Sequence, residues 1–91
     1  MTRELQREFL RQNHIDIEIT VVSDIKDGKT FHTGQYRYLV SHWAEDGTIV
    51  KNYYNDEKFD SYVEAEDKAL QIAYKILDIY KSIYPNDVDQ I

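Results

Sequence analysis

Apolar and polar residues alternate along three segments of the chain, and each of these segments predicts a β-strand. In residues 15–22, isoleucine or valine occupies every odd position, which is the period of a strand with one buried face. Residues 35–43 alternate as well, and residues 48–54 are rich in β-branched and aromatic side chains. Asp-Gly pairs at 27–28 and 46–47 are turn signals, so we predict a three-stranded antiparallel meander.

Two details of this meander stay open. The stretch 23–34 is longer than a minimal hairpin loop, so its register is not fixed. In the second strand, either Tyr36 and Tyr38 or Leu39 and Trp43 face inward, because large side chains lie on both sides. A three-stranded sheet covered by helices on one side leaves its other face open, so either choice exposes aromatic surface unless a partner covers it.

Helical periodicity marks both ends of the chain. In residues 3–12, Leu5 and Phe9 stand four positions apart among good helix formers, which predicts a short amphipathic helix. A second helix begins with a capping box, in which the Ser61 side chain accepts from the backbone and Glu64 reaches back.

The second helix carries a broad apolar stripe over residues 65–83, wide enough to cover one face of the sheet. Pro85 disfavours helical geometry at the residue before it, so we expect the helix to end there and the acidic tail, residues 86–91, to fray. The predicted fold class is α+β: a two-layer sandwich of order α-β-β-β-α, formed by one domain that spans residues 1–91.

Composition and charge narrow the function classes. The 91 residues are 42% hydrophobic and 31% charged, which is typical of globular proteins, and the chain has no cysteine for a disulfide or a thiolate metal site. The sequence predicts no signal peptide and contains no apolar run long enough to span a membrane, so we expect a soluble, cytoplasmic protein. The net charge of −6 disfavours nucleic acid and anionic membranes as partners and favours a basic protein. The simpler alternative is that the acidic charge serves only solubility.

No residue spacing predicts a catalytic, cofactor or metal site. His14, His32 and His42 are not arranged as zinc ligands. Ser41 and His42 are neighbours in a predicted strand, so their side chains point to opposite faces and cannot act as nucleophile and base. We therefore expect a non-enzyme without a cofactor.

An acidic segment, residues 56–67, at the start of the second helix is the most distinctive feature of the sequence. Its carboxylates are spaced so that they can replace phosphates in a groove lined by lysine and arginine, and nearby tyrosines are typical interface anchors. The predicted partner-binding residues are Asp56, Glu57, Asp60, Glu64, Glu66 and Asp67, with Tyr53, Tyr54 and Tyr62.

The first helix carries basic residues at Arg3, Arg7 and Arg11, which lie on one helical face. This stripe either binds an acidic partner or is a solvated face that Glu4 and Glu8 partly neutralise.

The order of elements resembles that of the double-stranded-RNA-binding domain, and the alanine-rich capped helix is similar to that family's second helix. In that family, lysines at the start of this helix hold RNA phosphates. This chain carries Glu64, Glu66 and Asp67 there, which repel phosphate, so we expect no direct binding of nucleic acid.

In layout and charge the chain also resembles the small acidic inhibitors that phages use against bacterial defence nucleases, the anti-CRISPR and anti-restriction proteins. The resemblance implies a phage-encoded, non-enzymatic inhibitor in the host cytoplasm. Such a protein blocks a nucleic-acid-processing defence protein, for example a CRISPR effector, by presenting a surface that mimics nucleic acid. The alternative is a structural or assembly module that dimerises or binds a protein partner through its open sheet face or an edge strand.

Overall fold

The computed structural model describes residues 2–54 and 56–83, with side chains described up to Tyr80. Its elements follow the predicted order and confirm the α+β fold with a three-stranded antiparallel sheet of order β1-β2-β3. The elements are α1 (Arg3–Gln12), β1 (Ile15–Lys26), β2 (Lys29–Trp43), β3 (Ile49–Tyr53) and α2 (Tyr62–Ile83). Pro85 and the tail 86–91, for which we expected fraying, lie outside the described residues.

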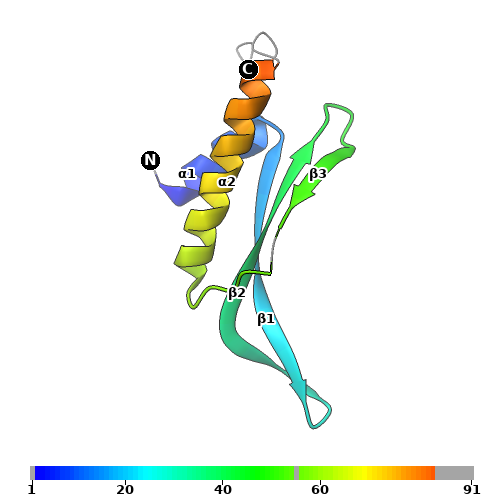
Figure 1. Cartoon of the computed structure of the whole chain (residues 1–91), viewed down its shortest axis with the longest axis vertical. Coiled ribbons are helices and arrows are strands. Elements are labelled where there is room, and N and C mark those ends of the chain that lie inside the picture. Colours follow the sequence, from blue (N-terminus) through cyan, green and yellow to red (C-terminus); the bar gives the residue numbers. More distant parts are fainter. Residues whose placement is uncertain (1, 55, 84–91) are drawn as a thin grey trace.

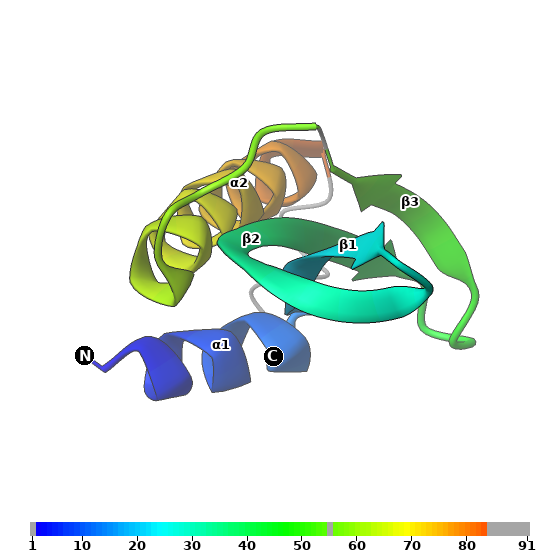
Figure 2. The ribbon, with the colours of Figure 1, turned by 90° about the horizontal axis from the view of Figure 1, so that it is seen from below.

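Both helices lie on the same side of the sheet (Figures 1 and 2). α2 packs across β1 and β2, while α1 packs on β1 and on α2. Three alanines of α2, at 65, 69 and 73, are fully buried, and their small side chains allow the helix to approach the strands closely. The buried core consists of Leu10, Ile15, Ile17, Tyr38, Val40, Ala69, Leu70, Ala73, Ile76 and Leu77.

The inner face of β2 is the one that carries Tyr38, Val40 and His42, all of which are buried under the helices. Leu39 and Trp43 point to the opposite face and are partly exposed. The small side chains of Ala65, Ala69 and Ala73 explain this choice, because they leave room for the large side chains of β2 beneath α2.

The β1–β2 hairpin is longer than predicted, and it projects past the start of α2 (Figure 1). We expected a loop of open register over 23–34, but the two strands stay paired up to Lys26 and Lys29. The turn between them has positive φ at Asp27 (55°) and Gly28 (74°), the geometry of a tight two-residue hairpin turn. We call residues 22–34 the arm; it carries a register shift near its base and gives the molecule a long axis of 54 Å.

Local hydrogen bonds fix the element ends. The Thr2 hydroxyl accepts from the amide of Leu5 at 3.1 Å, and the Ser61 hydroxyl accepts from the amide of Glu64 at 3.1 Å, so both helices begin with a side-chain cap. Between β3 and α2, Phe59 exchanges two backbone hydrogen bonds with Tyr36, at 2.8 and 2.9 Å. This bridge ties the acidic segment to the middle of β2.

Candidate protein-binding surfaces

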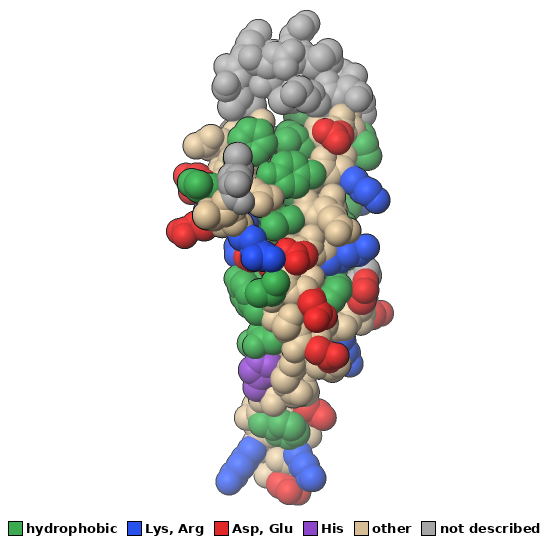
Figure 3. Space-filling model, turned by 90° about the vertical axis from the view of Figure 1, so that its left-hand side faces the viewer, with side chains coloured by type: hydrophobic (Ala, Val, Ile, Leu, Met, Phe, Trp, Pro, Cys, Tyr) green, Lys and Arg blue, Asp and Glu red, His purple; other side chains and the backbone are tan. Residues whose placement is uncertain are grey.

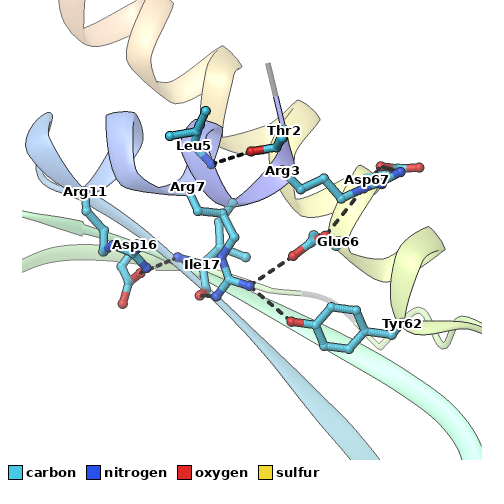
Figure 4. Close-up of polar contacts among 10 residues, drawn as sticks. All are labelled: Thr2, Arg3, Leu5, Arg7, Arg11, Asp16, Ile17, Tyr62, Glu66 and Asp67. Atoms are coloured by element: carbon cyan, nitrogen blue, oxygen red, sulfur yellow. Dashed lines mark hydrogen bonds and ion pairs between the residues drawn. The ribbon is translucent and has the colours of Figure 1, made fainter.

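The acidic segment divides into carboxylates that are held inside the molecule and carboxylates that face solvent. Glu66 is only 6% exposed, and its Oε2 accepts a hydrogen bond from Arg7 Nη1 at 3.0 Å. Arg3 approaches both acids of this turn, at 3.4 Å from Glu66 and 2.9 Å from Asp67 (Figure 4). Glu66 and Asp67 therefore attach α1 to α2.

Arg7 is the centre of this contact. Its Nη2 donates to the carbonyl of Ile17 on β1 at 2.6 Å, and its Nη1 also donates to the Tyr62 hydroxyl at 3.1 Å (Figure 4). Burial opposes the charge of Arg7, but hydrogen bonds to Tyr62 and Glu66 outweigh burial and raise the pKa of the guanidinium above its ordinary value. The guanidinium thus stays charged and joins α1, β1 and α2.

The arginine stripe of α1 follows only in part the interpretation as a solvated face that Glu4 and Glu8 neutralise, because its arginines also pair with other elements. Arg11 lies 3.2 Å from Glu8 and 3.8 Å from Asp16, so it pairs within its helix and with β1. Together with Arg3 and Arg7, it faces other elements of the same chain. The stripe serves to dock α1, which spacing within one helix did not reveal.

The remaining acids of the segment lie on the surface. Asp56, Glu57, Asp60 and Glu64 are exposed, and Asp60 accepts a weak hydrogen bond from Gln35 at 3.3 Å. Figure 3 shows that acidic side chains on the helix side of the molecule are interspersed with basic and hydrophobic ones.

The three tyrosines of the predicted surface differ in their surroundings. Tyr53 packs against the core, and the Lys51 ammonium lies 5.0 Å from its ring centre. The Tyr62 hydroxyl accepts a hydrogen bond from Arg7, and the Tyr62 ring meets the ring of Tyr36 edge-on, with ring centres 6.0 Å apart. Tyr54 is 72% exposed and Tyr62 is 43% exposed, so Tyr54 is the most accessible of the three as an anchor.

The sheet face that the helices leave uncovered is a second candidate surface. Cross-strand pairing brings together Glu18 and Leu39, and it places Trp43 opposite Ile49, which is 52% exposed. We call this surface the open face; it consists of Asp16, Glu18, Thr20, Arg37, Leu39, Ser41, Trp43, Ile49 and Asn52.

Leu39 and Trp43 were one of the two options that the sequence left open for this face, whereas the place of Ile49 beside Trp43 was not predicted. The pairing partner of Trp43 depends on a register shift in β3, and the alternation of residues in β3 alone does not reveal that shift.

A groove between α2 and the β2–β3 pair is lined mainly by apolar side chains: His42, Tyr53, Ile72, Lys75, Ile76, Ile79 and Tyr80. Burial lowers the pKa of His42 below its ordinary value of 6.5, and the neighbouring His14 lowers it further. His42 therefore stays neutral at pH 7 and packs edge-on against Tyr80, with ring centres 4.7 Å apart.

Within residues 2–54 and 56–83, no cluster of histidine, aspartate or glutamate is arranged to hold a metal ion. Neither of the two helices, as far as they are described, combines the length and apolarity that crossing a membrane requires. Comparison of the chain with protein-family models, curated proteins and solved structures finds no match.

Proposed function

We propose that this chain is a non-enzymatic protein-binding domain whose open face contacts the partner. The observation that carries the proposal is the aliphatic and aromatic surface formed by Leu39, Trp43 and Ile49 on the side of the sheet away from the helices. Antiparallel sheets that face water on one side usually carry polar residues on that side. An exposed apolar patch there is therefore unusual, and such patches mark interaction sites.

The charges around this surface indicate the chemistry of the partner. Asp16 and Glu18 lie on the same face, next to Ser41 and Leu39 of β2. A partner that presents an apolar centre with a basic margin would bury Trp43 and pair with these carboxylates. Burial of the aromatic and aliphatic centre supplies most of the affinity in such interfaces, and charges at the margin supply orientation and speed of association.

Trp43 provides a direct test because it is the chain's single tryptophan. We expect candidate basic proteins that bind the domain to shift the emission of Trp43, and we expect Ile49→Lys to weaken their binding at least tenfold. Ile79→Lys is the matched control, since Ile79 is similarly exposed but lies on α2. Binding without any change in Trp43 emission, or equal losses in the two variants, would contradict the proposal.

A second candidate function is inhibition of a nucleic-acid-processing protein by an acidic surface, as the likeness to phage inhibitors implies. The observation that favours it is the exposure of Asp56, Glu57, Asp60 and Glu64 within nine positions. Glu66 and Asp67 belong to this set by sequence, but their arginine partners reduce what they offer to another protein.

Competition experiments test this candidate. We expect the domain to displace DNA or RNA from a basic nuclease, with displacement that weakens steeply as salt is raised. Replacing Asp56, Asp60 and Glu64 by lysine should abolish displacement. The open-face variant Ile49→Lys should leave it intact, so that the two candidate functions are separated by their variants and by their salt dependence.

A further inference from the structure

The long strand β1 forms one edge of the sheet, and several hydrogen bonds reveal which of its backbone groups point outward. Arg7 donates to the carbonyl of Ile17 from outside the sheet, whereas Thr33 of β2 donates to the carbonyl of Val22 at 2.9 Å. Backbone groups alternate along a strand, so the odd-numbered residues of β1 direct theirs away from β2.

Side chains cap this edge at its two ends. The amide of Ile17 donates to the Asp16 carboxylate at 2.9 Å, and the amide of Ile25 donates to the Asp24 carboxylate at 2.8 Å. Between these caps lie the outward groups of residues 19, 21 and 23, for which the described part of the chain supplies no partner from another element. Such a row of free groups is a template for a further strand.

We propose that this edge pairs with the same edge of a second copy, as an antiparallel β1–β1 contact whose two-fold axis passes through Val22. Odd residues must then face odd residues, since these carry the outward groups. In this register Glu18 faces Lys26 of the other copy, and Ile19 faces Ile25, which is 71% exposed in the single chain.

Charge complementarity selects this register over its neighbours. Moving the axis to Val21 places Glu18 opposite Asp24 twice, which sets like charges against each other. Moving it to Ser23 removes every opposite-charge pair. With the axis at Val22, two Glu18–Lys26 pairs form, and no like charges meet.

The contact is isologous, so each copy contributes the same residues. Residue 19 pairs with 25 and residue 21 with 23, twice each; because the amide of Ile25 is already bonded to Asp24, this pairing corresponds to about six backbone hydrogen bonds. Because the axis is perpendicular to the sheet, the two open faces lie on the same side of a continuous sheet of six strands. This inference goes beyond the proposed function, because it concerns the edge of the sheet and a second copy of the chain.

Cysteine cross-linking tests the register, and the natural chain contains no cysteine that would interfere. In the proposed contact, Val22 faces its own copy in a non-hydrogen-bonded pair, where Cα atoms lie about 4.5 Å apart, within the range that a disulfide spans. We expect Val22→Cys to form covalent dimers under mild oxidation. Thr20→Cys alone should not, whereas Thr20→Cys mixed with Asp24→Cys should form a heterodimer.

Charge exchange provides an independent measurement that does not depend on cysteine chemistry. We expect Glu18→Lys and Lys26→Glu each to shift the monomer–dimer equilibrium at least fivefold toward monomer in analytical ultracentrifugation. The combined Glu18→Lys/Lys26→Glu variant should restore it. All of these side chains are exposed, and circular dichroism checks that each variant keeps the fold.

The inference is wrong if the natural chain stays monomeric at millimolar concentration. It is also wrong if the Val22→Cys variant cross-links no faster than the Thr20→Cys variant, or if the combined charge variant stays as monomeric as the two single variants.

Discussion

The guanidinium of Arg7 joins three elements at one point, because it stands on α1 and binds both β1 and α2. Glu66 is its charged partner and is nearly inaccessible to solvent. A half-buried ion pair adds little net stability over an apolar contact, but removing one member leaves the other charge buried without compensation.

We therefore expect Glu66→Ala to lower the free energy of unfolding by about 3 kcal/mol, the lower end of the range for broken buried pairs, because Arg7 keeps some contact with water. Glu64→Ala, an exposed change on the same helix, should cost about 0.5 kcal/mol or less. Urea unfolding of both variants measures the difference. Equal losses would show that the Arg7–Glu66 pair has no special role.

His42 gives the stability a pH dependence at the acidic side of neutrality. Its pKa is lower in the folded chain than the ordinary value of 6.5, so the folded state binds this proton less readily than the unfolded state does. The free energy of unfolding should accordingly fall as the pH decreases through 6.5 toward the folded-state pKa, and it should be insensitive to His42 above that range. Thermal unfolding of the natural chain and of His42→Gln between pH 5 and 8 measures this. The variant should show a shallower loss, and an unchanged slope would refute the assignment to His42.

The sequence identified the charged residues of this region but not their pairing. Arginines at every fourth position predict a common helical face, yet nothing in that spacing indicates what lies opposite. Arg7 and Glu66 are 59 positions apart, and their contact depends on how α1 packs on α2. Local patterns do not contain this information, so the acidic segment was predicted as a single surface.

At the scale of elements, the arm shows where hydrophobic periodicity stops being informative. Alternation predicts a strand because one face is buried, and beyond Val21 neither face of the hairpin has a helix to pack against. The signal that remained was Asp27-Gly28, which marked the turn correctly. The helices and β3 were predicted to within a residue or two of their ends, because capping and burial there act in the same direction.

Since the arm lacks a core, we expect it to open locally without unfolding the rest of the domain. Amides that bond across the arm, in residues 22–34, should exchange with deuterium much faster than the amide of Val40, a residue that is fully buried in the core. Hydrogen exchange at low protein concentration, followed by NMR, measures this. Equal protection in both regions would mean that arm and body unfold as one unit.

At the scale of the whole molecule, we expect the apolar residues of the open face to serve partner binding and to contribute little to the stability of the fold. Ile49 and the neighbouring Val50 are large apolar residues that bury little surface in the single chain. We expect the double variant Ile49→Thr/Val50→Thr to change the free energy of unfolding by about 0.5 kcal/mol or less and to reduce the binding of a hydrophobic dye. Val40→Ala is the matched control from the buried face and should cost about 2 kcal/mol. A large loss in the double variant would show that these side chains belong to the core.

The two outer edges of the sheet differ strongly in length: β1 has 12 residues, whereas β3 has 5. A strand that arrives at the β3 side finds only a brief run of backbone and a lysine at its centre, which are features that discourage stacking of many chains. Amyloid-like growth requires two long templates per chain, so that each added unit exposes the next docking position. This domain has one long edge strand, β1. Once two copies pair through β1, no long edge strand is left to which a further copy can add.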